Sequence, residues 1–150
     1  MVAYFAYGAT LNPQYMKRIV TGWTYMRRAT LEGYRLVFDA YSPSWRGGVA
    51  GIREETNSVV YGVVYLIHDE DLKSLDKYEG VPNTRARSRV TLQMDDTYLN
   101  GITHNTINPR PYVVPSKEYV AELLKGLKAV GYDEEVVKRV SDYIKSLKPT

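Results

Sequence analysis

A single glutamate, Glu79, has the placement expected of a group that transfers protons. It lies seven residues after Leu72 and four after Leu75, so in the helix predicted for residues 69–78 the three side chains share one face. Burial on that face and the dipole at the helix C-terminus would both raise the pKa of the carboxyl. Such a group can exchange protons near neutral pH. The alternative is a helix that ends before Glu79 and leaves its side chain in solvent.

Gly8 is the second candidate, because it interrupts the strand-like aromatic segment that begins at Tyr4. A glycine between a strand and a helix start allows backbone N–H groups to point at an anion. Phosphate-binding loops use several glycines and only one stands here, so an ordinary tight turn is the alternative.

The histidines and a run of arginines are weaker candidates. His68 and His104 fit no metal-ligand spacing, and we expect no catalytic role for them. Arg85, Arg87 and Arg89 alternate along a predicted strand and therefore project from one side. They could meet a phosphate or a carboxylate, but no aromatic pattern for base stacking accompanies them, so a solvated strand face is favoured.

Composition limits the class of protein. The 150 residues, 44% hydrophobic and 25% charged, predict one domain spanning residues 1–150. No apolar run reaches the roughly 18 residues of a membrane span and no secretion leader is recognisable, so no membrane association is expected. The chain has no cysteine, which excludes thiolate metal sites and fits the cytoplasm. A net charge of +3 is too balanced to predict a nucleic-acid partner.

Short strands dominate the first two thirds of the chain. Alternation and β-branched or aromatic content predict strands at residues 4–7, 34–41, 48–54, 58–67 and 89–94. Thr56, Asn57 and Ser58 predict a hairpin turn between the third and fourth of these strands, and Asn100-Gly101 predicts another further along.

Helix caps complete the expected architecture. Asn12 followed by Pro13 predicts a short helix after the first strand. Ser116 and Asp133 are expected to cap two longer helices, the first of which ends at Gly131. Strands followed by two closing helices predict an α+β domain, in which a curled, mostly antiparallel sheet is covered by helices.

Four segments, in this order, resemble the γ-glutamyl cyclotransferase family. YFAYGATL at residues 4–11 is similar to that family's Tyr-Gly-Ser-Asn-Leu loop. WRGGVAGI, followed by VVYGVVYLI at 59–67, resembles its Trp-x-Gly-Gly loop and central strands. LKSLDKYEGV at 72–81 is similar to its catalytic glutamate segment, and PSKEYV at 115–120 matches its C-terminal tyrosine helix.

The resemblance implies a small mixed β-barrel flanked by helices, with a cavity for a γ-glutamyl group. It further implies an enzyme that releases 5-oxoproline without a metal or cofactor, from a small-molecule γ-glutamyl substrate, as a monomer or homodimer. Glu79 would be the general acid/base. The substrate-binding residues implied are Tyr4, Tyr7, Gly8, Ala9, Thr10, Leu11 and Tyr119.

Two departures from the family pattern concern specificity. Ala9-Thr10 replaces Ser-Asn, which keeps the backbone donors but changes the side chains. Ala86 stands near the place of a family tyrosine, and Arg85 or Arg87 beside it could contact an acidic substrate tail. The leaving amine stays open. From a different class, the alternative is a binding module with weakened catalysis whose Arg85–Arg89 edge contacts an anionic ligand or nucleic acid.

Overall fold

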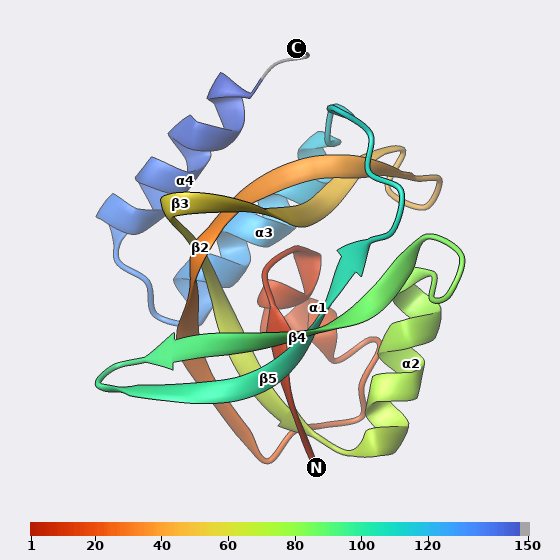
Figure 1. Cartoon of the computed structure of the whole chain (residues 1–150), viewed down its shortest axis with the longest axis vertical. Coiled ribbons are helices and arrows are strands. Elements are labelled where there is room, and N and C mark those ends of the chain that lie inside the picture. The colour runs from red at the N-terminus through yellow and green to blue at the C-terminus, as the bar shows by residue number, and fades with distance from the viewer. Residues whose placement is uncertain (148–150) are drawn as a thin grey trace.

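The computed structural model describes residues 1–147 and shows a closed five-stranded barrel flanked by helices (Figure 1). The strands are β1 (Val2–Ala6), β2 (Tyr25–Ser42), β3 (Gly47–Ile67), β4 (Arg85–Met94) and β5 (Thr97–Thr106). The helices are the 3₁₀ helix η1 (Ala9–Leu11), α1 (Pro13–Met16), α2 (Asp69–Glu79), α3 (Lys117–Ala129) and α4 (Glu134–Ser146). The expected α+β class with a small barrel is confirmed.

Strand pairing closes the barrel in the order β1-β3-β2-β4-β5. All neighbours are antiparallel except β1 and β5, which meet in parallel at Tyr4 and Ile102. The sheet is therefore mixed and mostly antiparallel, as expected. This closure brings residue 4 beside residues just beyond 100, which no local pattern could indicate.

Both predicted hairpin turns are wrong. Strand β3 runs without a break through residues 56–58 and pairs with β2 on both sides of a register shift between Glu32 and Tyr34. Asn57, with φ of 65°, belongs to this irregularity of one long strand. Asn100-Gly101 lies inside β5, and the chain turns instead after Met94, where Asp95 has φ of 50°. Turn-forming residues can therefore mark a bend in a curled strand as well as its end.

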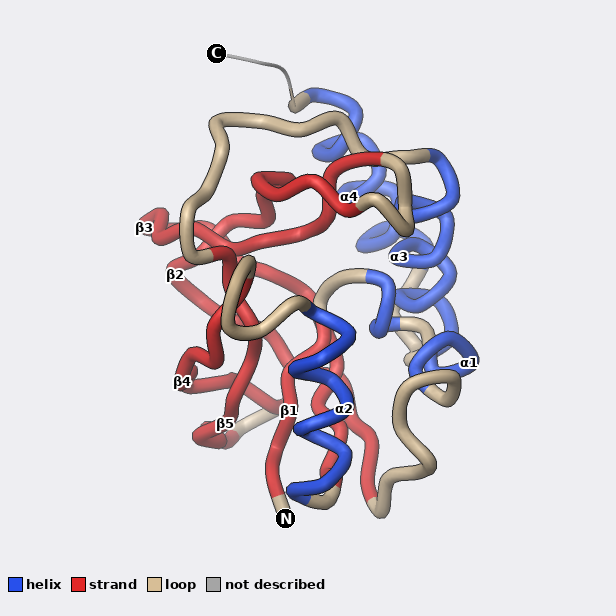
Figure 2. Tube along the Cα trace, turned by 90° about the vertical axis from the view of Figure 1, so that its right-hand side faces the viewer, coloured by secondary structure: helices blue, strands red, loops and turns tan. Residues whose placement is uncertain are grey.

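The helices cover the barrel unequally. Figure 2 shows α1, α3 and α4 on one side of the strands, while α2 lies along β1. Asn12, Ser116 and Asp133 each cap a helix through their side chains, as predicted. No helix within residues 1–147 is long and apolar enough to cross a membrane.

The boundaries of helix α2 decide where its last residue, Glu79, lies. Its N-cap is His68, and its C-cap is Gly80 in the left-handed conformation with φ of 85°. Leu72 and Leu75 are fully buried. The same face therefore carries Glu79 toward the barrel.

Candidate active site

Glu79 faces a small cavity at the end of the barrel. Its side chain is 18% exposed, so it does not extend freely into solvent. The cavity measures about 20 Å³, which is room for about one water molecule. It is lined by Tyr4, Tyr7, Gly8, Thr10, Ala50, Glu79, Arg85, His104 and Tyr119.

A wider cleft of about 220 Å³ adjoins this cavity and shares Glu79, Arg85 and Tyr119 with it. Hydroxyl groups are frequent along the rest of the cleft, from Tyr41, Ser42, Ser44, Tyr78 and Thr84. A ligand larger than water must therefore occupy the cleft, with its reacting end at the cavity.

The Gly8 turn packs against the hydroxyl of Tyr119. A β-carbon at Gly8 would collide with that hydroxyl, although φ of Gly8 is an ordinary −111°. Glycine is therefore needed here for close approach. The hydroxyl accepts a hydrogen bond from the Ala50 N–H at 3.0 Å. Within residues 1–147 the N–H groups of Gly8 and Thr10 have no hydrogen-bond partner, and both residues line the cavity.

Arg85 is an unexpected member of the site. It is 3% exposed, its Nε lies 3.3 Å from Glu79 Oε2, and its Nη2 donates to the Ala50 carbonyl at 2.5 Å. The prediction that Arg85 belongs to a solvated strand face is wrong, because α2 covers this end of β4. The guanidinium of Arg85 and the carboxylate of Glu79 therefore form an ion pair inside the site.

Arg87 is bound by a second carboxylate of α2. Its Nε lies 3.1 Å and 3.0 Å from the two carboxylate oxygens of Asp76. Two of the three arginines of β4 are thus paired with acids, so the basic edge required by the binding-module alternative is largely neutralised. Arg89 is exposed.

Asp76 also connects Arg87 to the interior. Its Oδ1 lies 2.7 Å from Nε2 of His104, and Nδ1 of His104 lies 2.9 Å from the Tyr4 hydroxyl. His104 is 1% exposed. The hydroxyl of Tyr7 donates to the His104 carbonyl at 2.7 Å. His104 therefore contacts both tyrosines of the site.

The site tyrosines are neutral. Burial, reinforced by the charge of Glu79, raises the pKa of Tyr4 well above its ordinary value. Burial likewise raises the pKa of Tyr7, against the opposing effect of Arg85. Burial and Glu79 raise the pKa of Tyr119 to about 12, although Arg85 and the backbone N–H groups of Ala50 and Ala9 oppose the shift. None of the three can act as a base at neutral pH.

An aromatic wall closes the cleft on the side of α1. The Trp45 indole donates to the Tyr78 hydroxyl at 3.1 Å and stacks edge-on against Tyr119 with ring centroids 5.1 Å apart. The hydroxyls of Tyr15 and Tyr78 are 2.9 Å apart. Trp45 is thus part of the cleft.

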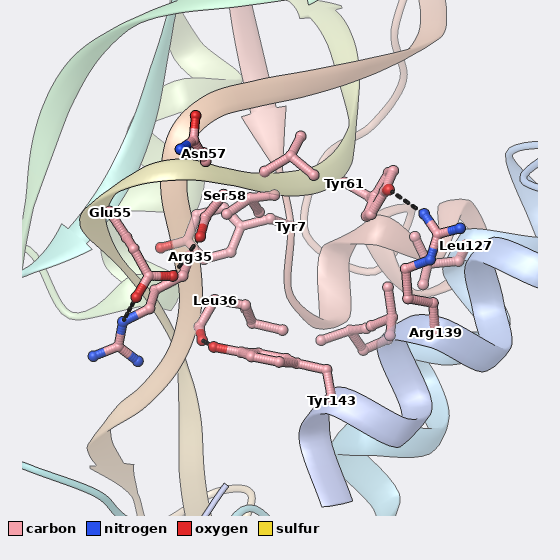
Figure 3. A pocket seen from close by; sticks show the side chains of 14 residues that line it. Tyr7, Arg35, Leu36, Glu55, Asn57, Ser58, Tyr61, Leu127, Arg139 and Tyr143 are labelled. Atoms are coloured by element: carbon pink, nitrogen blue, oxygen red, sulfur yellow. Dashed lines mark hydrogen bonds and ion pairs between the residues drawn. The ribbon is translucent and has the colours of Figure 1, made fainter. Parts of the chain in front are cut away.

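A second groove, of about 270 Å³, lies between the β2–β3 pair and helices α3 and α4 (Figure 3). It touches the candidate site only through Tyr7. Its single carboxylate is Glu55, which lies 3.6 Å from Arg35, and Tyr61 accepts a hydrogen bond from Arg139. Because it lacks Glu79 and the turn, we assign the chemistry to the cavity and cleft.

The structure brings most of the predicted residues together. Tyr4, Tyr7, Gly8, Thr10, Glu79 and Tyr119 line the cavity, and Ala9 lines the cleft. Leu11 differs, because it is fully buried against Gly126 of α3 and lines neither space. Leu11 therefore anchors the Gly8 turn against α3. Within residues 1–147 no group of three or more acidic or histidine side chains could hold a metal ion.

Sequence reasoning missed Asp76 and His104 as members of the site, and it offered Arg85 only as one of two possible contacts for an acidic substrate tail. Asp76 carried a usable signal, since it precedes Glu79 by three residues and so shares its helix face. Nothing in the sequence of β4 indicated that Arg85 is buried. The alternation along this strand indicates only that Arg85 and Arg87 point the same way. His104 meets its partners across 28 and 100 residues of sequence.

The closed barrel with its flanking helices has the fold of solved γ-glutamyl cyclotransferases. A solved structure named "Gamma-glutamyl cyclotransferase" superimposes with a TM-score of 0.87 at 24% identity, over 99% of this chain and 89% of that one. A yeast γ-glutamyl cyclotransferase described as specific to glutathione superimposes with a TM-score of 0.63 at 12% identity, over 96% and 95%. These similarities show the fold.

The sequence comparisons give the family. The family model described as "Gamma-glutamyl cyclotransferase, AIG2-like" matches residues 4–123, and the chain belongs to this family. A Bos taurus protein named Gamma-glutamylcyclotransferase is 30% identical over 146 residues, covering 92% of this chain and 76% of its own length. The Mus musculus protein of that name is 26% identical over 148 residues, covering 91% and 76%.

Proposed function

We propose that this protein is a γ-glutamyl cyclotransferase that releases 5-oxoproline and a free amine or amino acid from a γ-glutamyl compound. The observation that supports this most is the position of Glu79 in one cavity with the Gly8 turn. A carboxylate for proton transfer and backbone donors for a substrate carboxylate are the two groups that this reaction needs.

Glu79 is proposed to move one proton in each turnover. The α-amine nitrogen attacks the γ-carbonyl carbon, and the new C–N bond closes the five-membered ring while Glu79 takes a proton from that nitrogen. The old C–N bond then breaks, and Glu79 returns the proton to the departing nitrogen. The attack is intramolecular, so correct positioning supplies much of the acceleration.

The Gly8 turn is proposed to bind the α-carboxylate of the substrate. The N–H groups of Gly8 and Thr10 are unpaired within the described residues and border the cavity. Hydrogen bonds to an ionised acceptor are about twice as strong as neutral ones. Since these donors belong to the backbone, the replacement of Ser-Asn by Ala9-Thr10 leaves them in place.

Arg85 is proposed to favour leaving groups that carry a carboxylate. Within residues 1–147 the hydrogen bond that Arg85 makes is the one from Nη2 to the Ala50 carbonyl, which leaves Nη1 for a ligand, and the residue lines the cleft in which a leaving amine would lie. A guanidinium with unused donors matches a carboxylate. γ-Glutamyl amino acids therefore suit this cleft better than γ-glutamyl derivatives of simple amines, which are the second candidate class.

The test is 5-oxoproline release from a panel of γ-glutamyl compounds by the wild type and by Glu79→Gln. We expect turnover by the wild type and little by the variant, whose circular dichroism and melting temperature should match. Near-normal turnover by Glu79→Gln would remove the acid/base assignment. No 5-oxoproline from any compound, together with salt-dependent binding to nucleic acid, would instead support the binding module.

A further inference from the structure

A row of hydrogen bonds runs from Asp76 through His104 to Tyr4. The donor and acceptor of each bond can be assigned in turn, starting at Asp76. Burial alone would raise the pKa of Asp76, but hydrogen bonds from Arg87 and His104 outweigh it and hold the pKa below its usual value. Asp76 is therefore ionised and accepts hydrogen bonds without donating any. The His104 nitrogen beside it, 2.7 Å away, must carry a hydrogen.

This assignment fixes the tautomer of His104. As a neutral imidazole, which is the form assigned to it in this inference, His104 donates from Nε2 and accepts at Nδ1. The Tyr4 hydroxyl, 2.9 Å from Nδ1, must then donate its hydrogen to His104. The Tyr4 oxygen can present only lone pairs to the cavity that it lines.

His104 also fixes the direction in which the Tyr7 hydroxyl donates its hydrogen. Its hydroxyl donates to the His104 carbonyl at 2.7 Å, so its hydrogen also points away from the cavity. With Glu79, the cavity wall therefore carries three oxygen acceptors from three different elements or turns. A protonated amine has three N–H donors.

We infer that His104 and Asp76 are positioning residues that keep the Tyr4 and Tyr7 oxygens as acceptors for the α-amino group of the substrate, beside Glu79. This inference rests on the proposed function and assigns the amine end of the cavity. Glu79 then takes the third amine proton and releases it to the solvent of the open cleft, which frees the nitrogen lone pair for attack, while the two tyrosine oxygens keep hydrogen bonds to the other two hydrogens.

Tyr119 supplies the same cavity with a hydrogen-bond donor. Its oxygen accepts the Ala50 N–H, so its own hydrogen is not consumed by that bond. The Tyr119 hydroxyl is a donor that suits the γ-carbonyl oxygen, on which negative charge develops during attack. The amine and the carbonyl are thus recognised by groups of opposite hydrogen-bonding character.

The test compares two ligands that differ only in the α-amino group: γ-glutamylalanine and N-glutarylalanine. Their dissociation constants are measured by calorimetry in Glu79→Gln, which should bind without turnover. We expect the amino group to improve affinity about 10- to 100-fold. This advantage should fall by about tenfold when Tyr4→Phe is added, because one acceptor is lost.

Asp76→Asn, in the same background, tests the direction of the bonds. The amide oxygen is expected to stay with Arg87, so the amide NH₂ faces His104 and moves the imidazole hydrogen to Nδ1. Tyr4 would then donate into the cavity, and the amino-group advantage should fall although every side chain at the cavity is retained. Asp95→Asn is the matched control, because Asp95 pairs with Arg27 on the exposed surface.

The outcomes separate this inference from the proposed function. If the advantage of the amino group is unchanged in both Tyr4→Phe and Asp76→Asn, the inference is overturned while the proposed function stands. If Glu79→Gln binds neither ligand and the wild type releases no 5-oxoproline, both are overturned. A loss in both variants, with none in Asp95→Asn, supports the assignment. Circular dichroism of each variant confirms that it is folded.

Discussion

Helix α2 and strand β4 are joined by two acid–arginine pairs of very different character. Asp76 and Arg87 form a bidentate pair near the surface, where Arg87 is 44% exposed. One turn along the helix, Glu79 meets Arg85 through a single approach of 3.3 Å, and Arg85 is 3% exposed. The pair with the better geometry is the more solvated one.

The difference indicates what each pair does. In the outer pair, hydrogen bonds from Arg87 and His104 satisfy the carboxylate, so Asp76 holds its neighbours in one arrangement. In the inner pair, both groups face a cavity and Arg85 retains an unpaired Nη1 within residues 1–147. Incompletely satisfied buried charges cost stability, which proteins tolerate where a ligand completes the site.

The largest expected effect is that of Glu79→Gln on the inner pair. General acid/base groups contribute about 100- to 10,000-fold to turnover, and we expect kcat for 5-oxoproline release to fall within this range. Rate measurements at saturating substrate test it. A decrease in kcat of less than tenfold would mean that the inner pair resembles the outer one in function.

Arg85→Met should alter substrate preference more than turnover. We expect kcat/KM to fall about 10- to 100-fold more for γ-glutamylalanine than for γ-glutamylethylamine, which lacks the carboxylate, because a charge-assisted bond is lost. Arg85→Lys keeps the charge without the planar fork and should show an intermediate preference. Equal losses for the two substrates would assign Arg85 to Glu79 alone.

Asp76→Asn should reveal how much the outer pair contributes to the free energy of unfolding, and how this contribution depends on pH. Because the folded-state pKa of Asp76 lies below its ordinary value of 3.8, the ionised carboxylate stabilises the fold above that pH. We expect Asp76→Asn to be less stable than the wild type by about 1.5–3 kcal/mol at pH 5. The difference should shrink as the pH falls below 3.8, in urea unfolding measured at each pH. A constant difference would contradict the assignment.

Arg87→Met is expected to have the smallest effect. Exposed ion pairs contribute about 0–1 kcal/mol, and the contact between His104 and Asp76 does not require the guanidinium. Thermal unfolding should therefore shift by a few degrees at most, with 5-oxoproline release reduced less than in Arg85→Met. A loss of activity equal to that of Arg85→Met would remove the distinction between the pairs.

Local sequence signals predicted the helical half of the site well. The spacing of Leu72, Leu75 and Glu79, with Gly80 after them, indicated both the helix and the direction of the carboxylate. Caps at Ser116 and Asp133 were equally informative because they depend on neighbours within one turn. The strand half was predicted less well, since Asn57 and Gly101 mark positions inside long curved strands.

The amino-acid sequence by itself determined the helices and their caps, the candidate glutamate and, through ordered motifs, the family. Only the tertiary structure decided that Arg85 is buried, that His104 joins Asp76 to Tyr4, and that Gly8 must admit the Tyr119 hydroxyl. Periodicity and caps are local interactions and can be read along the chain. The environment of a charge depends on which distant segments cover it, and barrel closure and helix packing set that.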